Sequence, residues 1–376
     1  MKIGSIASLL GGILFAQATF AGNWTVVNSP NVGNTPNSLN AVDGASDSDV
    51  WAVGVSSASG YTSSRALIEH WDGTRWSIVK SISPGTSFNI LAAVAAVSAN
   101  DAWAIGEFSS SSGSYKTLIE HWNGAAWSVV PSPNASVTLN FLSGIAVVSA
   151  NDIWTVGSFQ NGDDSVPLTL HWNGSVWSIV SSPTIANIDT SLSGVTAIAA
   201  NDVWAVGASG DVNHEARTFT VHWNGTSWSI VPSANDGVEG NFLHAVTAIA
   251  SDNVWAVGRV ENIDTLALHW DGANWSVVST PTILNNGFAT LDSVVALPSQ
   301  SEWAVGQFFQ NSQSRSRTLT ELWNGSSWSI VSSPNRGLSH NYLNGVGATP
   351  IGTLWAVGAH YNNQLIERTL ILQKLP

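Results

Sequence analysis

Short apolar runs alternate with polar turns along the whole chain, and one stretch of about forty residues shows the pattern clearly. Ser98 to Asp101 form a polar turn, because Asn, Asp and Ser bond their own backbone there. Asn123-Gly124 separates two further runs, and this dipeptide is a strong hairpin signal because both turn residues take positive φ. The pattern predicts a four-stranded antiparallel meander with strands near residues 91–97, 103–108, 117–122 and 127–130.

The same meander is repeated seven times from end to end. A Trp-x-x-Gly phrase marks the second strand of every repeat, and successive tryptophans are 52, 51, 50, 51, 48 and 52 residues apart. A period near 50 residues is typical of architectures in which each unit is one small sheet. The marking residues are Trp51, Trp103, Trp154, Trp204, Trp255, Trp303 and Trp355.

The seventh repeat is split between the two ends of the chain. It stops after its third run, at residues 369–372, whereas residues 24–27 form a fourth run without three before it. A ring needs this arrangement, because the N-terminal strand then completes the last sheet and no open edge remains. The sequence therefore predicts an all-β, seven-bladed β-propeller with four-stranded antiparallel blades, closed by its N-terminal strand.

Tryptophan is the most regular residue of the repeat. All 20 tryptophans fall at three positions: seven in the second strand, six ending the third and seven opening the fourth. Such regular spacing of a large apolar side chain predicts core positions. Because the chain has no cysteine, packing has to supply its stability without disulfides.

The repeat resembles a known class of proteins. The phrases Ser149 to Trp154, His171 to Gly174 and Trp177 to Val180, followed by Ser182-Pro183, are similar to the tandem repeats of secreted bacterial β-propellers, themselves distantly similar to kelch and BNR-type propellers. The resemblance covers nearly all of residues 24–376. It implies architecture and no catalytic residues, and the sialidase Ser-x-Asp-x-Gly-x-x-Trp box, the paired glycines of kelch blades and a Trp-Asp repeat ending are all missing.

The N-terminus and the charge balance indicate where the protein acts. A Met1-Lys2 start followed by an apolar run to Phe20 predicts a signal peptide over residues 1–21, a propeller domain over residues 22–376 and a secreted, periplasmic or cell-surface location. Twelve Lys and Arg against 25 Asp and Glu give a formal net charge of −13. This surface repels phosphate, which argues against nucleic acid and anionic membranes as partners.

Two repeated polar positions are interpreted as structural. Five histidines precede the third-strand tryptophan, on strands that diverge between blades, so they cannot converge on one ion. Acidic turn residues, Asp49, Asp101, Asp152 and Asp202 with Glu302 once, offer too few oxygens for calcium and are expected to cap turns. We therefore expect no metal and no cofactor. The histidines are His70, His121, His171, His222 and His269.

A central site can only be built from the innermost strands. The residue after the first-strand leucine differs in almost every repeat, and His244 and Asp292 fall on adjacent blades. They could form a base and its orienting carboxylate, but the polar lining of a wet channel is the interpretation that the sequence favours. The full set is Asn40, Ala92, Ser143, Ser193, His244, Asp292 and Asn344.

The longer loops, which follow the second and fourth strands, all open on one face, here called the long-loop face; the tight-turn face is opposite. Aromatic residues there suit stacking on a sugar or anchoring a protein, unless they only roof the clefts between blades. The aromatic candidates are Phe108, Phe159, Phe308, Phe141, Phe242 and Tyr342. A basic residue also recurs in the third strand, either as a ligand contact or paired with Glu69, Glu120 and Glu321 four residues on: Arg65, Lys116, Arg217, Arg317 and Arg368.

Two functions follow. The first is a non-enzymatic, exported, monomeric binding module that engages a glycan or an extracellular protein through the long-loop face. The alternative is a carbohydrate hydrolase or lyase at the channel mouth that uses His244 and Asp292 with loop carboxylates such as Asp163, Asp164, Asp211 or Glu215. The even spread of aromatic and basic residues over the blades favours the first.

Overall fold

The computed structural model describes residues 23–111, 113–211, 214–237, 240–261, 263–283, 288–310 and 315–376. The predicted signal peptide lies outside these residues. The chain forms seven blades, each an antiparallel meander of four strands in sequence order except at the closure. The innermost strands are β2 (Asn37–Ser46), β6 (Phe88–Ser98), β10 (Asn140–Ser149), β14 (Thr190–Ala199), β18 (Asn241–Ala250), β22 (Ala289–Ala296) and β26 (Asn341–Ala348).

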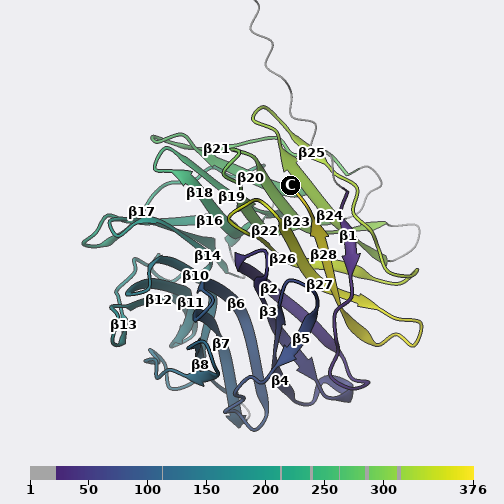
Figure 1. Cartoon of the computed structure of the whole chain (residues 1–376). Helices are drawn as coiled ribbons and strands as arrows, with labels where there is room; N and C mark the ends of the chain where they lie inside the picture. Colours follow the sequence, from purple (N-terminus) through teal and green to yellow (C-terminus); the bar gives the residue numbers. More distant parts are fainter. Residues whose placement is uncertain are drawn as a thin grey trace, which may run out of the picture.

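The innermost strands contact one another in succession, and β26 returns to contact β2, which makes the array a closed ring (Figure 1). The second strands are β3 (Asp49–Ser57), β7 (Asp101–Ser111), β11 (Asp152–Asn161), β15 (Asp202–Asp211), β19 (Asn253–Val260), β23 (Glu302–Gln310) and β27 (Leu354–Tyr361). The third strands are β4 (Ser64–Trp71), β8 (Ser114–Trp122), β12 (Asp164–Trp172), β16 (His214–Trp223), β20 (Thr265–Trp270), β24 (Arg315–Trp323) and β28 (Glu367–Lys374).

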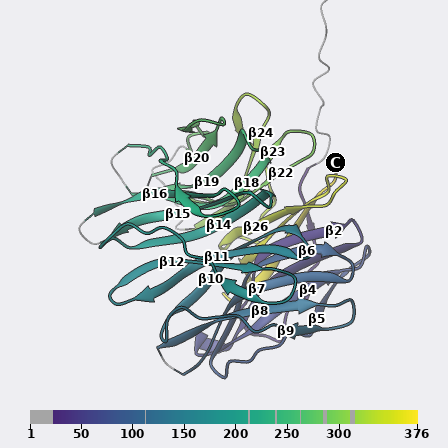
Figure 2. The same cartoon turned by 90° about the vertical axis from the view of Figure 1, so that its left-hand side faces the viewer.

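The outer strands are short, and the blades splay away from the centre like a fan (Figure 2). They are β5 (Trp76–Val79), β9 (Trp127–Val129), β13 (Trp177–Ile179), β17 (Trp228–Ile230), β21 (Trp275–Val277), β25 (Trp328–Ile330) and, for the last blade, β1 (Thr25–Val27). One single-turn 3₁₀ helix, η1 (Ser59–Tyr61), lies in a long loop of blade 1. No helix within the described ranges is long and apolar enough to span a bilayer.

The ring is closed as the split repeat predicts. β1 pairs antiparallel with β28, with Thr25 opposite Gln373 and Val27 opposite Ile371. Trp24, which is 4% exposed, lies edge-on to Trp303 of blade 6 with ring centroids 5.7 Å apart. The purple β1 and the yellow β28 lie side by side in Figure 1. The two ends of the chain therefore share one sheet and one packing contact.

Tryptophan packing holds neighbouring blades together. Each second-strand tryptophan contacts aromatic residues of the next blade; Trp103, for example, lies 5.0 Å from Trp172 and 5.7 Å from Trp177 by ring centroids. The second- and fourth-strand tryptophans are all buried, whereas the six that end third strands are only half-buried. At blade 7 the third-strand position is Lys374, whose Nζ lies 5.3 Å from the Trp303 ring. The core is therefore divided into clusters that lie between blades.

The glycine of the Trp-x-x-Gly phrase is required by a close backbone approach. A Cβ at Gly106 would lie 2.1 Å from the carbonyl oxygen of Ile90 in the first strand. The corresponding glycine of every other blade has the same conflict. Only glycine lets the first two strands approach this closely.

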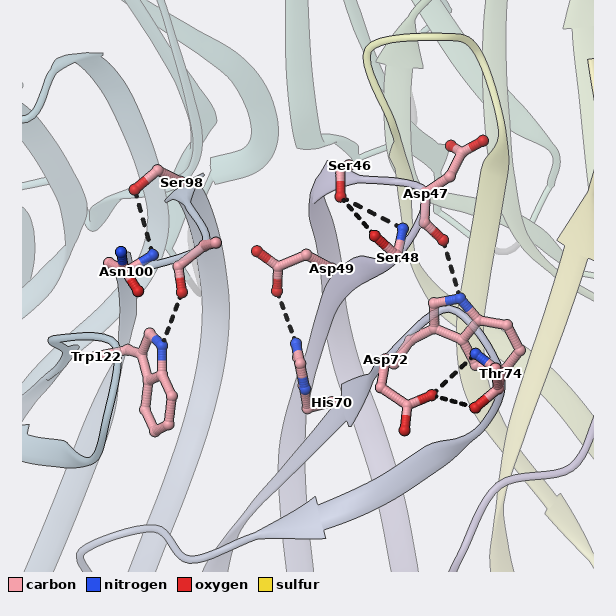
Figure 3. A network of polar contacts seen from close by, with 12 residues as sticks. Ser46, Asp47, Ser48, Asp49, His70, Asp72, Thr74, Ser98, Asn100 and Trp122 are labelled. Carbon is pink, nitrogen blue, oxygen red and sulfur yellow. Dashed lines mark hydrogen bonds and ion pairs between the residues drawn. The ribbon is translucent and has the colours of Figure 1, made fainter.

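The predicted structural role of the repeated histidines is confirmed, but the role of the acidic turns is not as expected. His70 Nε2 lies 2.6 Å from Asp49 Oδ1 (Figure 3). His121, His171 and His222 form the same pair with Asp101, Asp152 and Asp202 at 2.8 Å. The carboxylates thus bind histidine rather than cap turns. Serine does the capping instead, as where the Asn100 backbone N–H donates to Ser98 Oγ.

Candidate functional site

A β-bulge sits beside the central axis in every blade. In blade 2, Leu91 pairs with Gly106 and Ala93 with Ile105, so Ala92 has no partner in the ladder. The same slip follows the buried leucine of each first strand, and a bulge of this kind re-aims the unpaired side chain. The residues skipped by the pairing are Asn40, Ala92, Ser143, Ser193, His244, Asp292 and Asn344, which are the residues predicted to line the channel.

These bulge residues line a central cavity of about 620 Å³. Two of them tie neighbouring blades together: Asn40 Nδ2 donates to the Leu91 carbonyl at 2.8 Å, and Asn344 Nδ2 donates to the Leu39 carbonyl at 2.9 Å. Asp43, which also lines the cavity, accepts from the Ala96 backbone N–H at 2.9 Å. Burial raises the pKa of Asp43 to about 6, despite that hydrogen bond. The channel is therefore polar, and some of its lining residues form hydrogen bonds that link neighbouring blades.

The structure brings His244 and Asp292 together. His244 Nδ1 lies 3.2 Å from Asp292 Oδ1 and 3.1 Å from the Leu291 carbonyl oxygen. Both neighbours are acceptors, so Nδ1 carries the proton and the neutral ring keeps Nε2 as its acceptor. Thr290 Oγ1 donates to Asp292 Oδ1 at 2.9 Å. This is the geometry of a base with an orienting carboxylate. The described loop carboxylates Asp163, Asp164 and Glu215 do not line the same cavity, and the Asp211 side chain lies outside the described residues.

The three phenylalanines that share one repeat slot, Phe108, Phe159 and Phe308, are half-buried. Each packs against the core between two blades. Phe308 also lines a cleft of about 510 Å³ with Arg317, on the outer side of the blade. Core packing accounts for this slot without a ligand, so a binding role for these three rings stays a prediction.

The recurring basic residues do not pair with the glutamates, contrary to one expectation. Residues i and i+4 of a strand are roughly 13 Å apart, too far for an ion pair. Arg65, Arg317 and Arg368 instead donate to backbone carbonyls of the loop that enters the next blade, those of Gly85, Ser339 and Gly33. Lys116 and Arg217 are exposed. Their predicted contact with a ligand stays untested.

The buried glutamates bond to the preceding blade. Ser29 Oγ donates to Glu69 at 2.9 Å, and Ser81 Oγ and the Ile82 N–H donate to Glu120 at 2.9 and 3.0 Å. Both carboxyl groups are fully buried. Burial raises the pKa of Glu69 to about 8 and that of Glu120 to about 7, and the hydrogen bonds offset only part of the effect.

An aromatic pocket opens on the long-loop face between blades 6 and 7. It encloses about 340 Å³ and is here called the mouth pocket, because Asn344 lines both this pocket and the central channel. Its rings touch: Phe309 and His340 lie 6.4 Å apart and His340 and Tyr361 5.6 Å apart by centroid, both edge-on. Its lining residues are Gln307, Phe309, Ser316, His340, Tyr342, Asn344 and Tyr361.

The loop that carries His340 is held in place from blade 6. The Ser316 backbone N–H donates to His340 Nδ1 at 3.2 Å, which leaves the ring proton on Nε2 in the neutral form. Arg315 donates to the Leu338 carbonyl at 2.6 Å, and Arg317 to that of Ser339 at 3.3 Å. Three residues of blade 6 therefore hold this loop in place by hydrogen bonds, and the loop forms part of the pocket wall.

Blade 1 extends this group of rings. The Tyr61 hydroxyl donates to Glu367 Oε2 at 3.3 Å, beside Tyr361. Burial raises the pKa of Glu367, although that hydrogen bond lowers it in part. A smaller aromatic group lies across the ring, where the centroid of Tyr115 is 5.5 Å from Phe141 and 6.3 Å from Phe88. The long-loop face is thus asymmetric.

Of the predicted aromatic candidates, only Tyr342 lines the mouth pocket. Sequence reasoning missed Gln307, Ser316 and His340, because none belongs to a conspicuous motif. One signal could have found Gln307. It lies four residues after the second-strand tryptophan, and this repeat position varies in charge between blades, with Glu107 in blade 2 and Arg259 in blade 5.

No family model matches the sequence, and no curated protein sequence does so. Solved structures match in fold. The chain is similar to a structure of YCF48 bound to D1 peptide, with a TM-score of 0.55 and 13% identity over 94% of this chain and 95% of that one. A chain of the Mitotic Checkpoint Complex gives 0.55 and 9% over 99% of both, and a protein of unknown function from Dyadobacter fermentans DSM 18053 gives 0.53 and 9% over 94% and 97%. Identities this low support the propeller fold alone.

Proposed function

We propose that this protein is an exported, non-enzymatic propeller that binds a glycan in the mouth pocket. The observation that carries the proposal is the lining of that pocket: flat rings from Phe309, Tyr342 and Tyr361 stand beside the amides of Gln307 and Asn344. Apolar faces of a sugar stack on such rings, while its hydroxyls bind amide groups. Export rests on the N-terminal apolar run.

The size of the pocket favours a glycan over a protein surface. About 340 Å³ lies at the lower end of the range for small-ligand sites, whereas a stable protein partner needs roughly 800 Å² of matching surface. The likeness to YCF48, solved with a bound peptide, makes an extended peptide the alternative ligand. The channel that opens beside Asn344 gives a longer chain room to continue.

The test compares two equivalent positions on opposite sides of the ring. Tyr342 and Phe141 both precede the first-strand core leucine, but only Tyr342 lines the mouth pocket. Tyr342→Leu should weaken glycan binding about tenfold, because one aromatic anchor contributes roughly 1–2 kcal/mol, and Phe141→Leu should not. Both proteins are screened on a glycan array, and affinities are measured by calorimetry. Equal binding by both variants, or no glycan bound by the wild type, would contradict the proposal.

A second candidate, hydrolysis or elimination of a glycan at the channel mouth, is favoured by one observation, the 3.2 Å contact of His244 Nδ1 with Asp292. In that case the wild type should release reducing ends from the glycan that it binds, and His244→Gln should abolish release without loss of binding. Binding without turnover by the wild type would leave the first function.

A further inference from the structure

Arg259 has no hydrogen-bond acceptor among the described residues, and it lies against a phenylalanine that packs on the mouth pocket. Arg259, near the end of β19, places Cζ 4.8 Å from the ring centroid of Phe242 and 5.4 Å from that of Phe288. Its Nε is buried and has no hydrogen-bond partner within the part of the chain that the structure describes. Among the described residues no carboxylate forms an ion pair with it. A guanidinium held between two rings in this way is fixed in direction but has a free donor.

Three other arginines at this end of the molecule are occupied. Arg315, Arg317 and Arg368 all donate to backbone carbonyls of neighbouring loops. Each of them thus has a structural reason for its charge. Arg259 has none of this kind, because the ring faces that hold it satisfy the charge in part and accept no N–H from Nε.

The position of Arg259 connects it to the mouth pocket. Phe288, one of its two rings, lies 6.1 Å from Phe309, which lines the pocket. Phe242, the other ring, comes two residues before the channel residue His244. A ligand that leaves the pocket toward blade 5 therefore passes over Phe288 and reaches the guanidinium.

Charge is distributed unevenly around the ring. Five of the eight arginines lie at the long-loop ends of blades 5 to 7 or in the loop between blades 6 and 7, in a chain whose formal net charge is −13. They are Arg259, Arg315, Arg317, Arg336 and Arg368. This sector also carries the mouth pocket. The carboxylates of Glu261, Asp264 and Glu367 lie at the same long-loop ends, so Arg259 itself, and not a net positive field, is the group that would attract an anion.

We infer that the glycan bound in the mouth pocket is acidic and that Arg259 binds a sugar carboxylate, as in a uronic or sialic acid. The inference rests on the proposed function. A planar guanidinium fork matches a carboxylate with two parallel N–H···O bonds, which a lysine cannot form. The flanking phenylalanines exclude water and so strengthen those bonds.

The experiment uses glycans that differ only in charge. The wild-type protein is titrated with oligogalacturonate and its methyl ester, and with a sialylated oligosaccharide and its asialo form. It should bind at least one acidic member at least tenfold more tightly than the neutral twin. Arg259→Gln should remove the difference, and Arg259→Lys should restore it only in part. Arg75→Gln is the control, because it removes an equal charge from an exposed position on the opposite, tight-turn face.

The outcomes separate the two proposals. Unchanged binding of the neutral twin by the Arg259→Gln protein shows that the pocket is intact and folded. If the wild type binds acidic and neutral twins equally, or if the preference survives Arg259→Gln, the carboxylate assignment is wrong while glycan binding stands. Preference for sulfated sugars over carboxylated ones would also overturn it. If no glycan binds at all, the proposed function fails, and the inference fails with it.

Discussion

One buried carboxyl group should make this propeller less stable than it would be with the apolar residue that most blades carry at the same position. Glu321 lies in β24, is fully buried, and has no hydrogen-bond partner on either carboxyl oxygen within the described residues. Burial, and to a lesser extent the negative charge of Asp264, raises its pKa to about 8. Four other blades carry an apolar residue at the same repeat position: Leu170, Val221, Leu268 and Leu372. We expect Glu321→Leu to stabilise the protein.

The size of the effect follows from the pKa. Each pKa unit corresponds to about 1.4 kcal/mol, and the unfolded carboxyl ionises near its ordinary value of 4.5. At pH 7 the folded protein still holds the proton that the unfolded chain has released, and this difference lowers the free energy of unfolding by roughly 3 kcal/mol. The folded state binds more protons between pH 4.5 and 8, so the stability of the wild type should fall as the pH rises through this range.

Urea denaturation from pH 5 to 8 measures both consequences. Glu321→Leu should raise the free energy of unfolding at pH 7 and should flatten its decline with pH. Glu69→Leu is the matched control: it occupies the same repeat position, but its carboxyl accepts hydrogen bonds from Ser29, so its removal should gain less. A Glu321→Leu protein that is less stable than the wild type at pH 7, or that keeps the same pH slope, would refute the reasoning.

Two further predictions concern the ring and its histidines. Trp24→Ala should lower the free energy of unfolding by about 3–5 kcal/mol, since Trp24 is buried against Trp303. Deletion of residues 22–31 should unfold or oligomerise the protein. A truncated chain that stays monomeric with an unchanged Tm would contradict the closure. Chelator treatment should leave Tm unchanged, because the described repeat histidines bond to an aspartate or asparagine of their own blade; a fall of many degrees would show that metal binding contributes to stability.

The fold could be predicted because its signals are local and recur in six or all seven repeats. The turn dipeptide, the alternation of each strand and the split last repeat each specify a feature within a few residues, and the β1–β28 pairing follows from them. The bulges leave no such trace, since a slip among small residues such as Ala92 and Ala93 does not disturb the apolar pattern. The expected pairing of Arg65 with Glu69 is wrong, because residues four apart are neighbours on a helix but not on a strand.

The candidate site was harder to predict because it depends on contacts between blades. His340 meets Phe309 and Tyr361 only because loops of different lengths bring three segments together. A comparison of the repeats does not show such differences. It selects positions that recur in several blades, such as those of Phe108 and Phe159, and these residues pack against the core. The His244 and Asp292 contact was foreseen as a possibility, because both follow a core leucine on adjacent blades.

The bulge beside the axis has a consequence for how such a ring can change over generations. A skipped residue contributes no rung to the ladder, so its replacement leaves the pairing of Leu91 with Gly106, and of its counterparts, as it was. At Ala92, Ser143 and Ser193 the channel side chain can therefore change without any change in strand pairing, whereas Asn40 and Asn344 also hold neighbouring blades together. The channel side chains differ from blade to blade while the strand pairing stays the same, as Ser193, His244 and Asp292 of neighbouring blades illustrate. A library randomised at Ala92, Ser143 and Ser193 alone would therefore give channels of many polarities with the same strand pairing.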